Sequence, residues 1–239
     1  MKMMLALGVG MLAMSSPALS TDVKWADWIN VSSDNKTVTG VLPTTTPISI
    51  TYTNTAVFSF VQTGTGTNYW VEGTPAPYTG GSASYAPSNA PTPSEMVALD
   101  LPGTNTITFG EAISGLYLAI ISWNGNDAQF NQPFEVVSNG SGAYGQGTLT
   151  LTSDPVNSIY GFTQTGEPHA VLYFPGTFSS LTFTDTRAEF WHGVTVGVAM
   201  LASEVPGVPE PTTWAMMIAG MAMTGAAMRG RRKATVSFA

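Results

Sequence analysis

The chain has 239 residues, of which 44% are hydrophobic and 10% aromatic, enough to build a core, and this composition excludes a disordered protein. The formal net charge is −7, and the only basic residues between Thr21 and Val208 are Lys24, Lys36 and Arg187, so a nucleic-acid partner is excluded. The chain has no cysteine, which excludes disulfides, thiol nucleophiles and Cys-ligated metals.

The first twenty residues have the order of a secretory signal peptide. Lys2 supplies a positive charge, residues 5–14 form an apolar run, and residues 17–20 read Pro-Ala-Leu-Ser. Small residues three and one positions before a cut are typical of signal peptidase substrates. We therefore expect cleavage between Ser20 and Thr21, with Ala18 as the alternative last residue of the signal peptide.

Residues 21–203 have the pattern of an all-β domain. Short apolar runs alternate with Gly, Pro and Asn turn signals at intervals of about ten residues, and no long helical period interrupts them. This spacing predicts a jelly-roll-like antiparallel β-sandwich. Residues 116–121 are apolar on both faces and are expected in the middle of a sheet. The expected strands are 48–52, 57–61, 96–101, 106–109, 116–123, 134–137, 147–151, 159–162, 170–174, 181–184 and 190–200.

A β-solenoid is the main rival fold. Threonine-rich strands with glycine turns also occur in β-helical ice-binding proteins, but we find no fixed internal period between 12 and 50 residues. The sequence also has no Thr-x-Thr array at fixed spacing, and residues 44–46 and 63–67 are expected to be loops. Ice binding, which needs a flat and regular threonine face, is therefore the least favoured function.

Residues 63–95 form the least regular stretch, longer than an ordinary connection. Long loops in compact domains are often functional. Aromatic rings pack on sugar faces, so a glycan-contact platform is one hypothesis. The alternative is that the rings pin the loop to the sandwich. The aromatic residues concerned are Tyr69, Trp70, Tyr78 and Tyr85 in the loop, with Trp123 after its strand.

No catalytic set emerges from the sequence. His169 and His192 are the only histidines, and a metal site needs three or more converging ligands. Asp185, Arg187 and Glu189 are expected to form a solvated turn with one ion pair. We expect no catalytic residues, no metal and no cofactor.

Acidic and amide side chains leave two further possibilities open. Paired carboxylates could hydrolyse a polysaccharide, and the available acids are Glu72, Glu95, Asp100 and Glu111, although nothing in the sequence pairs them. Residues 124–127, Asn-Gly-Asn-Asp, offer oxygen ligands for calcium, but a hairpin turn explains them better.

The C-terminal end combines a short motif, an apolar stretch and a basic cluster. Pro209-Glu210-Pro211 is followed by Trp214, by an apolar run to Met228, and by a basic cluster over residues 229–233 that holds Arg229, Arg231 and Arg232. A single transmembrane helix is expected over residues 212–228, short for a bilayer of about 30 Å. The basic cluster should stay cytoplasmic, which leaves the body of the protein outside.

This tail resembles the PEP-CTERM sorting signal of Gram-negative bacteria, also described as the C-terminal domain of ice-binding proteins. The resemblance covers about thirty residues and implies processing by exosortase, a membrane cysteine protease. Carriers of the signal often come from bacteria that make exopolysaccharide or biofilm. In family tails the chain commonly ends near the basic cluster, whereas here it continues over residues 234–239.

These observations predict three segments: a signal peptide (1–20), a β-sandwich ectodomain (21–203) and a sorting tail (204–239). We expect an exported protein of the cell surface or extracellular matrix, non-catalytic and associated with exopolysaccharide. Its expected partners are exosortase, polysaccharide and, through the C-terminal helix, transiently the inner membrane. The alternatives are a polysaccharide-acting enzyme and, less favoured, an ice-binding protein.

Overall fold

A computed structural model describes residues 21–83, 85–199 and 221. The predicted signal peptide, the sorting motif and, apart from Met221, the predicted helix 212–228 lie outside the described residues. Among the described residues, no helix is both long and apolar enough to span a membrane.

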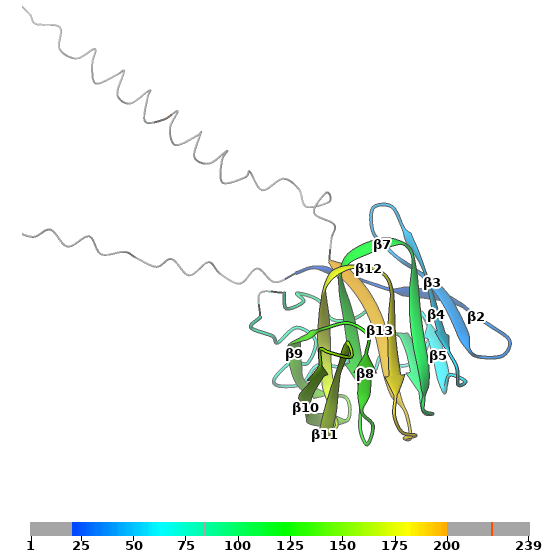
Figure 1. Ribbon diagram of the computed structural model, residues 1–239. Coiled ribbons are helices and arrows are strands. Elements are labelled where there is room, and N and C mark those ends of the chain that lie inside the picture. The colour runs from blue at the N-terminus through cyan, green and yellow to red at the C-terminus, as the bar shows by residue number, and fades with distance from the viewer. Residues whose placement is uncertain (1–20, 84, 200–220, 222–239) are drawn as a thin grey trace, which may run out of the picture. The chain divides into compact units, whose positions relative to one another are not determined.

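The described domain consists of thirteen β-strands, and every pairing between named strands is antiparallel. The predicted all-β class is therefore confirmed (Figure 1). In chain order the strands are β1 (Val23–Trp25), β2 (Asp27–Val31), β3 (Thr37–Leu42), β4 (Ile48–Asn54), β5 (Phe60–Thr63), β6 (Glu95–Leu99), β7 (Gly103–Ile121), β8 (Ala128–Phe130), β9 (Glu135–Gly142), β10 (Gly145–Asp154), β11 (Ile159–Gly166), β12 (His169–Asp185) and β13 (His192–Ala199).

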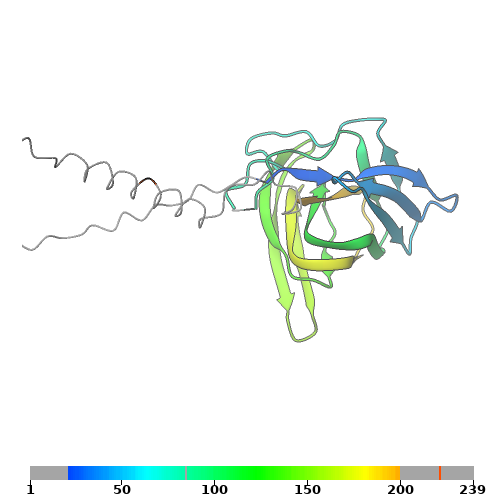
Figure 2. The same ribbon diagram turned by 90° about the horizontal axis from the view of Figure 1, so that it is seen from above.

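Two long strands, β7 and β12, organise the domain. They pair with each other along their length and bend together at Gly115 and Gly176, both of which have positive φ, a conformation that glycine adopts without steric cost. Figure 2 shows the two strands arching over the top of the domain. The sequence predicted two strands in place of each, and in β12 the reason is that Pro175-Gly176 has the composition of a turn. It is a bend inside one strand.

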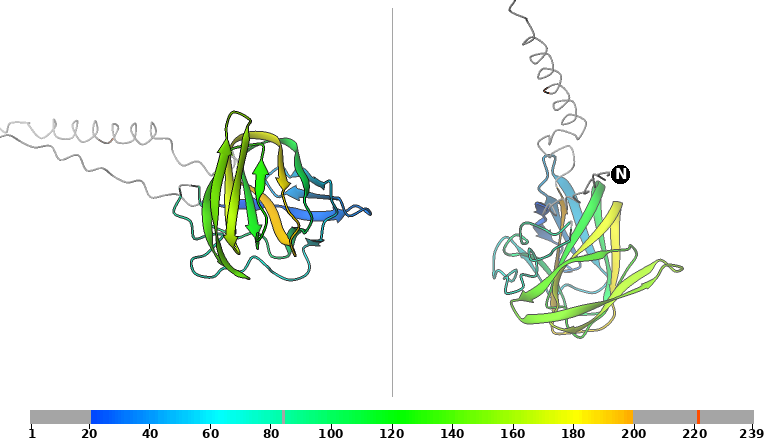
Figure 3. Two further views of the ribbon diagram at one scale, coloured as in Figure 1. Left: turned by 60° about the horizontal axis from the view of Figure 1, so that its bottom comes forward. Right: turned by 90° about the vertical axis from the view of Figure 1, so that its left-hand side faces the viewer.

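The arches give each long strand two sets of neighbours. The first half of β7 pairs with β4, and its second half pairs with β13. Strand β12 pairs through its first half with β9 and through its second half with β8. The pairings β12–β8–β11–β10–β9–β12 close into a ring of five strands, so the predicted jelly-roll sandwich is not confirmed. The β10–β11 hairpin protrudes from this ring (Figure 3).

Two hydrophobic clusters fill the domain. The larger one receives Leu116, Leu118 and Ile120 from one face of β7. The smaller one receives Tyr117 and Ala119 from the opposite face of the same strand. Residues 116–121 are thus buried on both faces, as the sequence predicted. The connection from Gly64 to Ser94 contributes Trp70 and Tyr78 to the smaller cluster, and it therefore covers that face of the sheet.

The sequence did not predict the first three strands or β8. Strands β1 and β2 are short and contain Lys24, Asp27 and Asn30 among their apolar residues. Their Trp25 and Trp28 are nonetheless buried, one in each cluster. The predicted loop over residues 63–95 agrees with the structure, because β5 ends at Thr63 and β6 begins at Glu95.

Candidate functional site

The loop aromatics separate into buried and accessible groups. Trp70 and Tyr78 are 3% and 0% exposed, and their rings meet edge to face with centroids 5.2 Å apart. The Trp70 indole N–H donates to the carbonyl of Glu95 at 3.2 Å. These two rings attach the loop to the sheet, which is the alternative to a glycan platform that the sequence left open. Because they are buried, they are not available to contact glycan.

Trp123 is likewise unavailable to contact glycan. Its side chain is fully buried, with its ring centroid 3.9 Å from that of His192 and 5.4 Å from that of Phe162. Of the five aromatic residues predicted to contact glycan, only Tyr69 and Tyr85 retain solvent exposure, Tyr69 partly and Tyr85 extensively.

His192 lies between two carboxylates in the interior. Its Nδ1 is 2.6 Å from Oε1 of Glu189, and its Nε2 is 3.5 Å from Oδ1 of Asp185. The other oxygen of Asp185 accepts from Asn105, whose own amide oxygen accepts from the hydroxyl of Tyr52. The predicted solvated turn over residues 185–189 is therefore wrong for Asp185 and Glu189, whose side chains are buried, whereas Arg187 is exposed as predicted. Asp185 is buried because β12 extends to it and pairs with β7 there.

The carboxylates determine the charge of His192. Burial alone lowers the pKa of this histidine, but hydrogen bonds and charge interactions with Asp185 and Glu189 outweigh burial and raise the pKa to about 9. The ring is thus an imidazolium at neutral pH, with a carboxylate oxygen beside each of its two nitrogens. The side chain of His192 is inaccessible to solvent. His192, Asp185 and Glu189 therefore form an internal ion-pair network that a substrate cannot reach.

Two other buried titratable groups lie beneath the loop. Burial lowers the pKa of His169 to about 4, against an opposing effect of Glu167, and its Nδ1 is 3.4 Å from the hydroxyl of Tyr78. Burial raises the pKa of Glu95 to about 7, although its carboxylate accepts a hydrogen bond from the backbone N–H of Trp28 at 2.8 Å. His169 is therefore neutral throughout the physiological pH range, and Glu95 is neutral over the lower part of it.

The remaining candidate acids are not paired with each other in any recorded contact. Glu72 accepts hydrogen bonds from the backbone N–H groups of Tyr78 and Thr79, so it orders the loop. Glu111 is exposed. The backbone carbonyl of Asp100 accepts a hydrogen bond from the backbone N–H of Glu189. In residues 21–83 and 85–199, together with residue 221, no group of three His, Asp or Glu side chains could hold a metal ion.

The predicted calcium segment has a structural use. The side-chain oxygen of Asn126 accepts from the backbone N–H groups of Thr186 and Arg187, each at 2.9 Å. The amide of Asn124 donates to the carboxylate of Glu167. These contacts tie the connection after β7 to the chain segments that follow β11 and β12.

A surface group of aromatic rings comes from four separate segments. This aromatic cluster consists of Phe60, Tyr69, Tyr144 and Trp191. The ring centroid of Trp191 lies 5.1 Å from that of Tyr69, 5.3 Å from that of Phe60 and 5.6 Å from that of Tyr144. Tyr144 is 47% exposed, and the neighbouring Phe190 is 90% exposed. Only Tyr69 was predicted, because the other rings are brought together by the fold.

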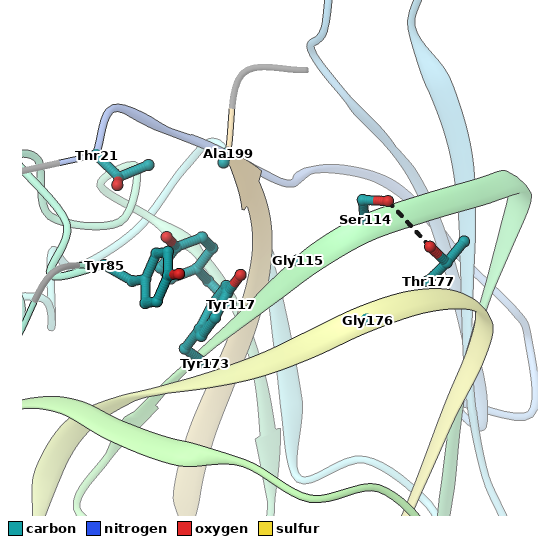
Figure 4. Close-up of a pocket in the computed structure, with 9 residues that line it drawn as sticks. All are labelled: Thr21, Tyr85, Ser114, Gly115, Tyr117, Tyr173, Gly176, Thr177 and Ala199. Carbon is teal, nitrogen blue, oxygen red and sulfur yellow. Dashed lines mark hydrogen bonds between the residues drawn. The ribbon is translucent and has the colours of Figure 1, made fainter. Parts of the chain in front are cut away.

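Tyr85 belongs to a second aromatic site, the tyrosine pocket (Figure 4). The ring of Tyr85 stacks on that of Tyr173, and Tyr117 lies with its ring centroid 5.0 Å from that of Tyr173. The pocket has a volume of about 410 Å³ and also contains Ser114 and Thr177, whose hydroxyls are 3.1 Å apart. It lies under the arches, next to Thr21 and Ala199. Among the described residues, no charged side chain lines it.

The outer surface of four paired strands carries threonines in register, contrary to our expectation that no regular array exists. Their apolar neighbours along each strand are buried, so the hydroxyl side chains face outward. The regularity runs across strands and was therefore invisible along the chain. In the register of β3, β4, β7 and β12, one row is Thr39, Thr51, Thr108 and Ser180, and the next is Thr37, Thr53, Thr106 and Thr182.

A family model described as the PEP-CTERM protein-sorting motif matches residues 207–233. The chain carries a PEP-CTERM sorting motif. No curated protein and no solved structure matches it.

The PEP-CTERM motif defines how the protein is handled. It marks an exported protein that exosortase sorts, with a membrane-anchored precursor that exosortase processes. The matched range contains Pro209, Glu210, Pro211, Trp214, Arg229, Arg231 and Arg232, the residues on which the resemblance was based. The motif lies outside the described residues, and the aromatic cluster and tyrosine pocket belong to the β-domain that it delivers.

Proposed function

We propose that this PEP-CTERM protein is a non-catalytic, sandwich-like component of the cell surface or extracellular matrix that associates with exopolysaccharide. The observation that carries the proposal is the aromatic cluster at the surface. Solvent-exposed rings on a soluble domain mark interaction sites. Tyrosine and tryptophan present apolar faces together with a hydrogen-bonding group, which suits the alternating apolar and hydroxylated surfaces of sugars.

The placement of the acidic and histidine side chains supports the proposal that the protein is non-catalytic. A glycoside hydrolase needs two carboxyl groups facing a cleft, about 5–10 Å apart. Among the described residues, the carboxylates that converge on a histidine are Asp185 and Glu189, and they are buried with it. The rings of the aromatic cluster, in contrast, reach solvent.

Binding to the polysaccharide made by the producing cells tests this proposal. We expect the protein purified from those cells to bind the polymer and to leave the number of reducing ends unchanged. Tyr144→Ala should weaken binding by about 3- to 10-fold, because one aromatic contact contributes about 0.5–1.5 kcal/mol. Tyr160→Ala, in β11 and outside both aromatic sites, is the control. Absence of binding, or new reducing ends, would contradict the proposal.

Ice binding is a second candidate, supported by the threonine rows. Neighbouring hydroxyls in such rows repeat at about 4.8 Å across strands and about 6.7 Å along them, and none of these positions is charged. Partition of the protein into slowly growing ice tests this candidate. Thr106→Lys would place a charge inside the rows and should abolish partition, whereas Thr163→Lys on β11 should not. Exclusion of the wild-type protein from ice would rule the candidate out.

A further inference from the structure

We propose that the domain has two separate sugar-binding surfaces, the aromatic cluster and the tyrosine pocket, and that it cross-links polysaccharide chains. This inference rests on the proposed function, because it assumes that polysaccharide is the ligand. It goes further by assigning a second site and a consequence that a single site cannot produce.

The two sites lie at opposite ends of β13. Trp191 of the aromatic cluster directly precedes this strand, and Phe60 pairs with Ala98, which pairs with Gly193 near the start of β13. Tyr117 of the tyrosine pocket pairs with Gly197, and Ala199 at the end of the strand lines the pocket. A strand of eight residues spans about 26 Å, so the sites are more than one sugar unit apart.

The surface between the sites is closed. Trp70, Tyr78 and Trp25 lie in the hydrophobic cluster that separates them, and all three are buried. The loop that carries Trp70 and Tyr78 covers this face of the sheet. One polymer chain therefore has no continuous aromatic groove from one site to the other, and each site must take its own segment of polymer.

The chemistry of the tyrosine pocket suits an uncharged sugar unit. Tyr85 is 47% exposed and presents ring surface at the rim, while the hydroxyls of Ser114 and Thr177 offer donors and acceptors further along the pocket. The volume of about 410 Å³ is in the range of small-ligand sites. The rings stack on each other and leave no cage around a cation, and the described side chains that line the pocket are uncharged. In a mature chain that begins at Thr21, the α-amino group of that residue would add one positive charge beside the pocket.

The backbone keeps the pocket open. A Cβ atom at Gly115 would lie 3.0 Å from the hydroxyl oxygen of Tyr173, which is closer than side chains ordinarily approach. Gly115 and Gly176, at the bends of β7 and β12, both line the pocket. The same arches that join the two halves of the domain therefore leave room for a ligand beside Tyr173.

Cross-linking is measured by turbidity of polysaccharide solutions titrated with the purified protein, alongside direct binding and the molecular mass of the free protein. Tyr85→Ala removes a ring from the pocket and Tyr144→Ala removes one from the cluster; the two tyrosines are equally exposed, at 47%. Tyr160→Ala is the control. We expect wild type and control to give turbidity that rises and then falls as protein exceeds polymer.

Each single-site variant should still bind the polymer, about 3- to 10-fold more weakly, and should lose the turbidity maximum. Binding by the wild-type monomer without turbidity, or unchanged turbidity with Tyr85→Ala, would overturn the second site while leaving the proposed function intact. No binding by the wild-type protein would overturn both. Loss of the maximum in Tyr160→Ala would also overturn the inference, because turbidity would then not depend on the two sites.

Discussion

Tyr85 stacks on Tyr173, with ring centroids 4.7 Å apart and planes 18° from parallel. This contact joins the long loop to β12 at the point where the strand approaches its bend. It also forms one wall of the tyrosine pocket, so packing of the loop and the shape of a candidate binding site depend on the same pair of rings.

The space beside Tyr173 can be tested at Gly115. Gly115→Ala should destabilise the domain by more than Gly125→Ala, although both residues have φ near 65–70°. Each substitution should cost about 1 kcal/mol or more from backbone strain. A Cβ at position 125 meets nothing within 4 Å, whereas a Cβ at position 115 meets Tyr173. Urea unfolding measures the difference; equal losses would contradict the close approach.

The attachment of the loop can be tested at Trp70. Trp70→Ala should lower the free energy of unfolding by about 3–5 kcal/mol, because it leaves a cavity under the loop and removes the hydrogen bond to Glu95. Tyr69→Ala is the neighbouring control and should cost clearly less, because Tyr69 is only partly buried. Thermal unfolding and protease cleavage within residues 64–94 report the change. Similar losses for both variants would refute the assigned role of Trp70.

The imidazolium of His192 predicts a stability that depends on pH. Its pKa is about 9 in the folded protein and about 6.5 in the unfolded chain, so the stabilisation is complete below pH 6.5 and is lost as the pH rises through 9. The free energy of unfolding should therefore fall between pH 6.5 and 9. His192→Gln should be less stable at pH 6 and should lose this contribution to the slope. A wild-type slope retained in full by His192→Gln would be inconsistent with the network.

Glu95 also makes the free energy of unfolding fall as the pH rises, but over a lower pH range than His192. Its pKa rises from 4.5 to about 7 on folding, so burial favours the protonated form, and the folded state loses stability as the pH rises from 4.5 to 7. Glu95→Gln keeps an acceptor for the N–H of Trp28 and removes the ionisation. We expect the variant to be more stable than wild type at pH 8 and to lack the fall in stability between pH 4.5 and 7, because it has no carboxylate to ionise inside the protein. Equal stability at pH 8 would disprove the raised pKa.

His169 makes the free energy of unfolding fall as the pH falls, over the acidic range. Its pKa of about 4 lies below the unfolded value of 6.5, so its contribution is present above pH 6.5 and is lost as the pH falls towards 4. His169→Gln should therefore show a smaller loss of stability between pH 6 and 4 than wild type, measured by urea unfolding at each pH. Parallel pH curves for the two proteins would be evidence against a buried neutral histidine.

Local pattern predicted those parts of the fold that depend on neighbours in sequence. The doubly apolar run 116–121 identified a strand buried on both faces, and the composition of residues 63–95 identified the long loop. Pro175-Gly176 does not distinguish a turn from a bend within a continuous strand, because both have the same local sequence. The distinction depends on pairing with β7, which the local sequence does not record.

The candidate sites could be predicted only in part, because they depend on long-range register. Tyr69 and Tyr85 were identified from their loop, but their partners Trp191 and Tyr173 come from other segments. The sequence around Asp185 and Glu189 predicts a polar turn, although the pairing of β12 with β7 buries Asp185 beside His192. The threonine rows show the same limit, since their spacing exists only between strands.

Intact mass spectrometry of the protein recovered from envelope and medium is the most direct test of export and sorting by exosortase. We expect a mature N-terminus at Thr21, the first residue of the described domain, which pairs with Pro87. We also expect a C-terminus within residues 209–214, where exosortase has released the tail. A cytoplasmic protein that retains Met1 and Ala239 would show that the chain is neither exported nor sorted.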